Sequence, residues 1–238
     1  MSGAARESIW TRPDRRSRGP VPQHSRAEIV AAATALADQG GLPAVSMRAV
    51  AAALDTGAGS LYRYLSSRDD LLDLMVDAAL GELSLDGPLT GDWLDGLVGV
   101  AREQLALYRR HPWLTEATRR AGAFGPQTIN YFERCLAIMA PLPSAASAKM
   151  EAVAVLTGVV SLFSTPTPMN SPVDDPQAMA QKQAVAMQLF ALVDPAAHPH
   201  LTAAFTNPAP PAGDAPDLFE RTVRSVLRGL LTSDAPAG

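Results

Sequence analysis

The chain has one cysteine, Cys135, among its 238 residues. A single thiol cannot form an intrachain disulfide, and it does not supply the paired Cys and His spacing of a zinc site. We therefore expect a fold held together by an apolar core, with no metal and no cofactor. Apolar residues make up 47% of the chain, which is enough for such a core and argues against disorder of the whole.

Long apolar runs are lacking too. The N-terminus is rich in Arg, Ser and Pro, and it has no apolar stretch of the signal-peptide kind. The run from Ala152 to Phe163 is too short for a membrane span. These absences predict a cytoplasmic protein that has no membrane partner.

Catalytic motifs are missing as well. The chain has no Gly-rich phosphate loop, no Gly-x-Ser-x-Gly elbow, no His-Glu-x-x-His motif and no paired acid motif. We therefore expect a protein that is not an enzyme. Strand patterns are essentially absent, and apolar residues recur at helical spacing instead, which predicts an all-α fold.

Charge is unevenly distributed along the chain. The net charge of −4 does not by itself suit a partner as acidic as DNA. Residues 1–68, however, hold nine arginines and five acidic residues, so this part carries +4 and the remainder carries −8. The N-terminal part can attract phosphates while the rest is repelled from them. A merely solvated basic tail is the alternative for residues 1–20.

An apolar stripe interrupted by a tight turn extends from Ser46 to Arg68. Ser46 can cap a helix whose apolar residues recur at helical spacing. The residues from Asp55 to Gly57 break that pattern, because Asp and Gly tolerate turn conformations. Leu61 and Leu65, four residues apart, restart the stripe. Two short helices in this arrangement are the layout of a helix-turn-helix, whose second helix enters the major groove of DNA.

The block from Arg26 to about Leu83 resembles the N-terminal domain of the TetR family of bacterial repressors. A small-residue first helix over 27–39, stopped by two glycines, begins the resemblance. The other stretches that carry it are Gly40 to Leu42, Ser46 to Arg48, Ala51 to Leu54, Gly59 to Leu65 and Ser67 to Leu72.

The resemblance implies a domain organisation and a function. Residues 1–24 would be a disordered basic arm, residues 25–85 a three-helix DNA-binding domain, and residues 86–238 a helical ligand-binding and dimerisation bundle. The chain would act as a homodimeric transcription regulator, and more specifically as a repressor that a small-molecule inducer releases from double-stranded operator DNA. The alternative is a helical dimeric ligand-binding or interaction protein without operator-specific DNA binding.

The resemblance also assigns DNA contact to one residue of the first motif helix, four around the second helix and one beyond it. These residues are Arg48, Ser60, Tyr62, Arg63, Tyr64 and Arg68. Arg48 would contact a phosphate or a base edge, and Arg63 could pair with a guanine edge. Tyr62 and Arg68 would each reach a phosphate. The alternative for Arg48 is a solvated surface arginine.

The turn departs from the family pattern, which is Gly, then Val, then a polar cap. Asp55 can adopt the left-handed conformation that the turn requires, so the fold survives the change. Ala58 and Gly59 carry no base-reading groups at the start of the second helix. The reading of bases is therefore expected to shift to Ser60, Arg63 and Tyr64.

The second half is predicted to be a helical bundle that begins after a junction at Asp86 to Pro88. Its helices are predicted near 91–110, 112–122, 126–140, 144–164, 175–193 and 216–232. Prolines mark two loops, Ser164 to Pro176 and Asn207 to Pro216, because Pro removes the backbone donor that a helix needs.

Seven residues of this half are candidates to contact a ligand. They are His111, Trp113, Phe124, Tyr131, Phe132, Met139 and Phe163. Apolar residues at such positions more often belong to the core, which is the alternative for each. For His111 the favoured alternative is a polar residue at a helix junction.

The last predicted helix has one apolar and one charged face. It looks like the final, dimer-forming helix of the TetR family. Val223, Leu227 and Leu230 are therefore expected at a two-fold dimer interface, because such an apolar face is too wide to leave in water.

Overall fold

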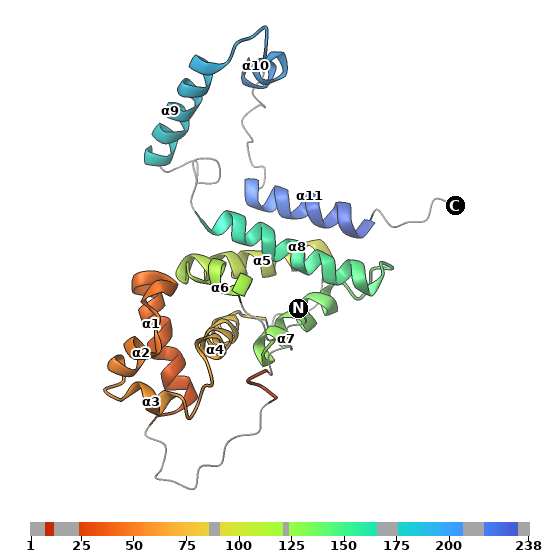
Figure 1. Cartoon of the computed structure of the whole chain (residues 1–238). Helices are drawn as coiled ribbons and strands as arrows, with labels where there is room; N and C mark the ends of the chain where they lie inside the picture. Colours follow the sequence, from red (N-terminus) through yellow and green to blue (C-terminus); the bar gives the residue numbers. More distant parts are fainter. Residues whose placement is uncertain are drawn as a thin grey trace, which may run out of the picture.

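The structure is a computed structural model that describes residues 8–11, 24–85, 91–120, 124–165, 176–206 and 217–232. Over these ranges the chain forms eleven α-helices and no strand, so the all-α prediction is confirmed (Figure 1). The helices are α1 (Arg26–Ala44), α2 (Met47–Ala53), α3 (Ala58–Leu61), α4 (Arg68–Leu80), α5 (Trp93–Arg110), α6 (Leu114–Arg120), α7 (Pro126–Ile138), α8 (Ala146–Ser164), α9 (Pro176–Leu192), α10 (Pro199–Thr206) and α11 (Leu218–Thr232).

Serines begin three of the first four helices. Ser25 accepts a hydrogen bond from the N–H of Glu28, and the Glu28 carboxylate accepts one from the Ser25 N–H, which makes a capping box. Ser46 and Ser67 each accept a bond from the N–H three residues further on. These bonds satisfy N–H groups that the first turn of a helix leaves free. The sequence therefore determines locally where α1, α2 and α4 start.

The turn between α2 and α3 has the predicted conformation. Asp55 has a φ of 50°, which is the left-handed region. The N–H of Thr56 donates to the carbonyl of Ala51 at 2.9 Å and closes the end of α2. Leu61 and Leu65 are buried beneath the turn. The helix-turn-helix is thus held by the residues that predicted it.

Helix α1 runs further than the predicted stop at its two glycines. Gly41 has a φ of 68°, so the helix bends there and then continues to Ala44. Glycine tolerates this φ because it has no Cβ. The two glycines therefore mark a kink instead of an end.

Helices α5, α7, α8 and α11 form the main body of the second half. Helix α8 packs against both α5 and α11, and α7 contacts α4 and α5 (Figure 1). By length and composition alone α8 could cross a membrane, because it has 19 residues and its mean hydropathy reaches 1.5. The expectation that no apolar run reaches this length is therefore wrong. Its packing on α5 and α11 identifies α8 as a helix of the bundle.

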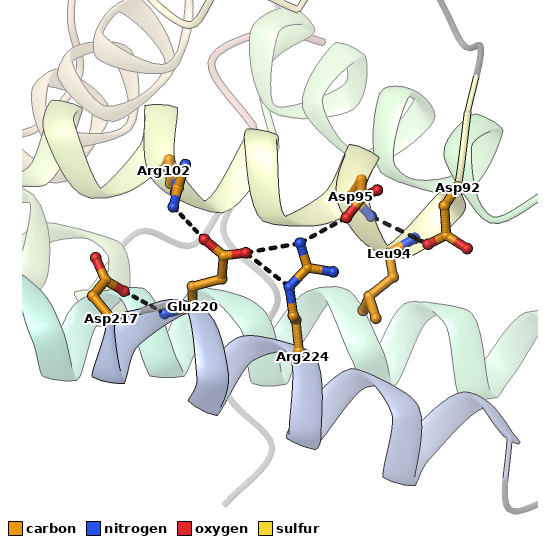
Figure 2. Close-up of polar contacts among 7 residues, drawn as sticks. All are labelled: Asp92, Leu94, Asp95, Arg102, Asp217, Glu220 and Arg224. Atoms are coloured by element: carbon orange, nitrogen blue, oxygen red, sulfur yellow. Dashed lines mark hydrogen bonds and ion pairs between the residues drawn. The ribbon is translucent and has the colours of Figure 1, made fainter. Parts of the chain in front are cut away.

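A polar network fixes α11 against α5 (Figure 2). Glu220, although buried, forms ion pairs with Arg102 of α5 and with Arg224 one turn further along α11. Arg224 also reaches Asp95 of α5 at 2.6 Å. These carboxylates raise the pKa of Arg224. The N–H of Glu220 donates to Asp217 just before the helix, so α11 is held at its start and along its side.

This arrangement overturns the predicted use of Val223 and Leu227. Their exposed fractions are 0% and 1%, because the apolar face of α11 packs inside the same protomer. Leu230 is partly buried against the same core. Periodicity shows which face of a helix is apolar, but it does not distinguish contact with the chain's own bundle from contact with a second copy.

The N-terminal arm is only partly described. Residues 1–7 and 12–23 lie outside the described residues, but Ile9 is 2% exposed and belongs to the apolar core, with Trp10 packed against it. The prediction of disorder is therefore wrong for residues 8–11. The predicted junction at Asp86 to Pro88 lies outside the described residues, as do residues 166–175 and 207–216 of the two proline-rich loops.

Candidate DNA-binding surface and ligand cavity

The helix-turn-helix presents several polar side chains at its surface. Arg48 on α2 and Arg63, just after α3, are exposed, and Tyr62 is 51% exposed. Ser60 on α3 is partly exposed. These four side chains have the exposure that contact with phosphates and base edges requires.

Tyr64 faces the other way. Its ring packs against the apolar core, and its hydroxyl is buried without a hydrogen-bond partner among the described residues. The guanidinium of Arg63 lies 5.9 Å from the centre of this ring, at cation–π distance. Tyr64 therefore supports Arg63 and does not itself present a hydroxyl for reading bases, contrary to the prediction.

Arg68 does not have the surface position that its predicted role requires. Its Nε donates to the carbonyl of Val45 and its Nη2 to the carbonyl of Leu42, both at 2.9 Å. These carbonyls lie at the end of α1, where a helix has acceptors without partners of its own, although the Leu42 carbonyl also accepts the N–H of Val45. Arg68 thus joins the start of α4 to the end of α1, and the prediction of a free phosphate contact is replaced by a structural role.

His111 and Trp113 form part of a joint between the two halves of the chain. Nδ1 of His111 and Nε1 of Trp113 both lie 2.7 Å from Oδ1 of Asp38 on α1. Nε2 of His111 lies 3.2 Å from Glu82, which follows α4, and Glu82 also pairs with Arg110. Neither aromatic residue lines the ligand cavity described next, so the junction alternative for His111 agrees with the structure.

A cavity of about 230 Å³ opens between α4 and helices of the second half. Among the described residues, ten side chains from α4 to α8 line it, and none of these is charged: Val76, Leu80, Gln104, Tyr108, Thr118, Phe124, Thr128, Tyr131, Phe132 and Thr157. Three of the predicted ligand residues, Phe124, Tyr131 and Phe132, are among them. Met139 is fully buried in the core, and Phe163 packs on Phe219 with ring centres 5.4 Å apart. These last two do not line the cavity.

The polar side of the cavity was missed by sequence reasoning. Gln104 is 1% exposed and accepts a hydrogen bond from the hydroxyl of Tyr131 at 3.1 Å. Its Nε2 lies 3.5 Å from Oγ1 of Thr157 on α8. A signal existed, because Gln104 interrupts an otherwise apolar face of α5 that runs through Ala101 and Tyr108. A lone amide on such a face indicates either a buried network or a polar ligand.

Burial keeps the groups around the cavity uncharged. It raises the pKa of Tyr131 well above its ordinary value and also raises the pKa of Tyr108. The same effect raises the pKa of the neighbouring Cys135 to about 12. Desolvation penalises a phenolate or thiolate in these positions. The cavity therefore offers neutral hydrogen-bonding groups only.

Helix α4 contributes a wall of the cavity and also a cap for α7. Oδ1 of Asp77, which is buried, accepts bonds from the backbone N–H and the hydroxyl of Thr128 at 2.9 and 3.0 Å. Thr128 lies in the first turn of α7, where a carboxylate is favourable. A side chain at Gly125 would collide with the Asp77 carboxylate, so any other residue there would have to displace that carboxylate. In the described ranges no group of three or more His, Cys, Asp and Glu is placed to hold a metal ion.

Comparisons with known proteins cover both halves of the chain. A family model described as bacterial regulatory proteins of the tetR family matches residues 29–75. A model described as a tetracyclin repressor-like C-terminal domain matches residues 87–233. Together these models extend over the DNA-binding surface and eight of the ten cavity residues, with Val76 and Leu80 lying between the two matched ranges.

Among curated proteins, the HTH-type transcriptional repressor DrrR1 of Streptomyces coeruleorubidus is 39% identical over 155 residues, which are 65% of this chain and 57% of DrrR1. An HTH-type transcriptional regulator of Saccharopolyspora erythraea is 33% identical over 58% of each chain. The matched region thus spans less than two thirds of these relatives. Among solved structures, the Streptomyces coelicolor TetR family protein ActR in complex with actinorhodin has a TM-score of 0.72 and 25% identity, and the match covers 92% of this chain and 100% of ActR.

Proposed function

Because the chain belongs to the TetR family of bacterial regulatory proteins, we propose that it is a transcriptional repressor that binds operator DNA and leaves it when a small molecule fills the cavity. The family is one of regulators and not of enzymes. The observation that carries the proposal is that a single helix, α4, packs on α1 of the DNA-binding domain and also lines the cavity. The bound actinorhodin of ActR supports a small-molecule ligand in this fold.

Helix α4 provides the physical link between the two sites. Val76 and Leu80 of α4 line the cavity, and Asp77 between them holds the first turn of α7. The same helix packs on α1, to which Arg68 binds it. A ligand that changes the spacing of α4 and α7 would therefore move the helix-turn-helix. The ligand must bind the conformation that does not bind DNA more tightly, since equal affinity for both would shift nothing.

On the DNA side, we assign contact to Arg48, Ser60, Tyr62 and Arg63. Arg63 is the candidate to contact a base edge, because its side chain is exposed just after α3 and its guanidinium packs on the ring of Tyr64. A bidentate pair with guanine is worth about 1–3 kcal/mol of discrimination. Arg48 and Tyr62 would position the helix through phosphates. Tyr64 and Arg68 have structural roles in this scheme.

The second copy that a repressor of this kind requires would dock on the outer face of α8. Leu162 is 66% exposed and Val155 is 38% exposed, although both belong to an apolar helix. A two-fold dimer would cover this face with its own copy. It would also place two recognition helices about 34–36 Å apart, to face half-sites one turn of DNA apart.

The decisive experiment is a gel shift with DNA from the region upstream of the gene that encodes the chain. The parent should bind it, and Arg63→Ala should bind about 5-fold to 150-fold more weakly, as expected from the loss of a base contact. Arg109→Ala, which removes the same charge from an exposed position on α5, is the matched control and should bind like the parent.

The alternative function, ligand binding without operator-specific DNA binding, gives a different result in the same assay. The parent would then bind the upstream DNA weakly and no more tightly than unrelated DNA. The Arg63→Ala and Arg109→Ala variants would lose DNA affinity to the same extent. Such a result would overturn the proposal of a repressor and would leave the cavity as the functional site.

A further inference from the structure

The cavity limits the charge of its ligand. All ten of its lining residues are neutral, and the buried phenols of Tyr108 and Tyr131 cannot readily become charged there. Asp77, whose carboxylate bonds to the lining residue Thr128, already accepts two hydrogen bonds from it. A charged ligand would lose its hydration without gaining an ionic partner, which is costly in a buried site. The neutral lining therefore favours an uncharged ligand.

The apolar side of the cavity favours a flat ring. Phe124 and Phe132 meet edge to face with ring centres 5.6 Å apart, and Tyr131 meets Phe132 in the same way at 5.8 Å. Val76 and Leu80 of α4 also line the cavity. Aromatic side chains prefer offset or edge-to-face contact with further aromatic rings. At about 230 Å³, the space is smaller than the usual pocket for a drug-sized ligand.

The polar side of the cavity can bind a hydrogen-bond acceptor. The amide oxygen of Gln104 accepts the Tyr131 hydroxyl, whereas its Nε2 makes a long bond of 3.5 Å to Thr157 and also interacts with the hydroxyl of Tyr108. An amide nitrogen carries two hydrogens, and the bond to Thr157 is long, so a better-placed acceptor in the cavity can compete for the Gln104 N–H groups. A buried donor gains free energy when it exchanges a weak contact for a well-placed acceptor.

We propose that the ligand of this cavity is a small uncharged aromatic compound with a carbonyl oxygen that accepts a hydrogen bond from Gln104. The proposal rests on the proposed function for the role of the cavity as the inducer site. Gln104 determines specificity in this arrangement, because Tyr131 and Thr157 orient its amide from two helices. A purely aliphatic ligand would offer the Gln104 N–H groups no acceptor, and an acid would bring an uncompensated charge.

Calorimetric titration of the full-length protein with three bicyclic probes tests this inference. 1-Tetralone is an uncharged aromatic ketone, tetralin has the same rings without the oxygen, and 1-naphthoate is an anion of similar size. We expect 1-tetralone to bind about tenfold more tightly than tetralin, which is the value of one hydrogen bond to a buried donor. No heat of binding is expected for 1-naphthoate.

Two variants separate the roles of the two sides. Gln104→Leu should abolish the tenfold preference for 1-tetralone and leave both uncharged probes with equal affinity. Phe132→Leu should weaken both probes by the same factor and preserve the preference, because it removes ring contact and no hydrogen bond. Circular dichroism at 222 nm verifies that each variant is folded. If a variant does not fold, the three titrations of the parent protein still test the inference.

Four results would overturn the inference. They are equal binding of 1-tetralone and tetralin by the parent, tighter binding of 1-naphthoate, binding of none of the three probes, and a preference for 1-tetralone that survives in a folded Gln104→Leu variant. These titrations contain no DNA, so their failure leaves the gel-shift result for the repressor untouched. Conversely, a parent that ignores DNA but binds 1-tetralone would refute the repressor and retain the ligand class.

Discussion

Replacing Arg68 by alanine should destabilise the fold far more than it weakens DNA binding. The guanidinium donates two bonds of 2.9 Å to the carbonyls of Val45 and Leu42, which lie 23 and 26 residues away in the chain. Removing it leaves the Val45 carbonyl without that donor, whereas the Leu42 carbonyl keeps the N–H of Val45. The variant therefore loses the attachment between the end of α1 and the start of α4.

The expected size follows from these two bonds. A hydrogen bond from a charged donor contributes about 1.5–3 kcal/mol, and the partial exposure of Arg68 places each bond at or below the lower end of that range. We therefore expect the free energy of unfolding to fall by about 2–3 kcal/mol. For a chain of this size that lowers the melting temperature by about 5–10 °C. Arg68→Lys should recover about half of the loss, because one ammonium does not match a forked pair of carbonyls as a guanidinium does.

Urea titration followed by circular dichroism measures the stability, and fluorescence anisotropy with upstream DNA measures the binding. Arg63→Ala is the matched variant, and it should keep the parental stability while losing DNA affinity. At a temperature where Arg68→Ala is folded, its DNA affinity should stay close to that of the parent. If Arg68→Ala instead keeps full stability and flattens the salt dependence of DNA binding by about one unit, Arg68 contacts a phosphate and our reasoning is refuted.

Three further predictions concern other parts of the chain. Leu162→Asp on the outer face of α8 should give a folded monomer in sedimentation velocity, whereas Val223→Asp should unfold the protomer. If Val223→Asp instead gives a folded monomer, the dimer interface lies on α11, as the sequence predicted. The pKa of Cys135 is raised to about 12 from 9.0, so its thiol should resist iodoacetamide at pH 8 in the native protein, and rapid native alkylation would contradict its burial. As the pH rises, the thiol of the unfolded chain ionises before the buried thiol of the folded chain. The stability that the protonated thiol contributes below pH 9 is therefore lost between pH 9 and 12. In urea titrations, Cys135→Ala should reduce this fall of the free energy of unfolding with pH. Gly125→Ala should displace the Asp77 carboxylate from α7 and weaken both DNA binding and the response to ligand, and a parental response would show that this contact does not link the two sites.

Local chemistry made much of the fold predictable. Ser46 and Ser67 cap their helices through bonds to residues three positions away, and Asp55 takes the left-handed conformation that its position in the turn suggested. Each of these features depends on a few neighbouring residues, so a single sequence contains the necessary information. Six helix ranges in the second half were predictable for the same reason, because apolar periodicity and prolines are local. The short helix α10 was not among the predicted helices.

Long-range partners explain the errors. Arg68 has the family position of a phosphate contact, but its bonds go to carbonyls more than 20 residues away. Val223 lies on an apolar face, and nothing in the periodicity of α11 indicates that α5 and α8 cover it. Gln104 was a recoverable omission, because a single amide on an apolar helix face can be read directly from the sequence.

Helix α4 lines the cavity and also packs on α1, and this double role affects the ligand concentration at which the protein responds. If occupancy of the cavity lowers DNA affinity by some factor, bound DNA must lower ligand affinity by the same factor. A molecule on its operator would then respond only at a higher ligand concentration than a free molecule. The dose at which transcription begins would depend on how many operator copies the cell contains, and doubling the copies of a target promoter would shift the threshold without a single change in the cavity.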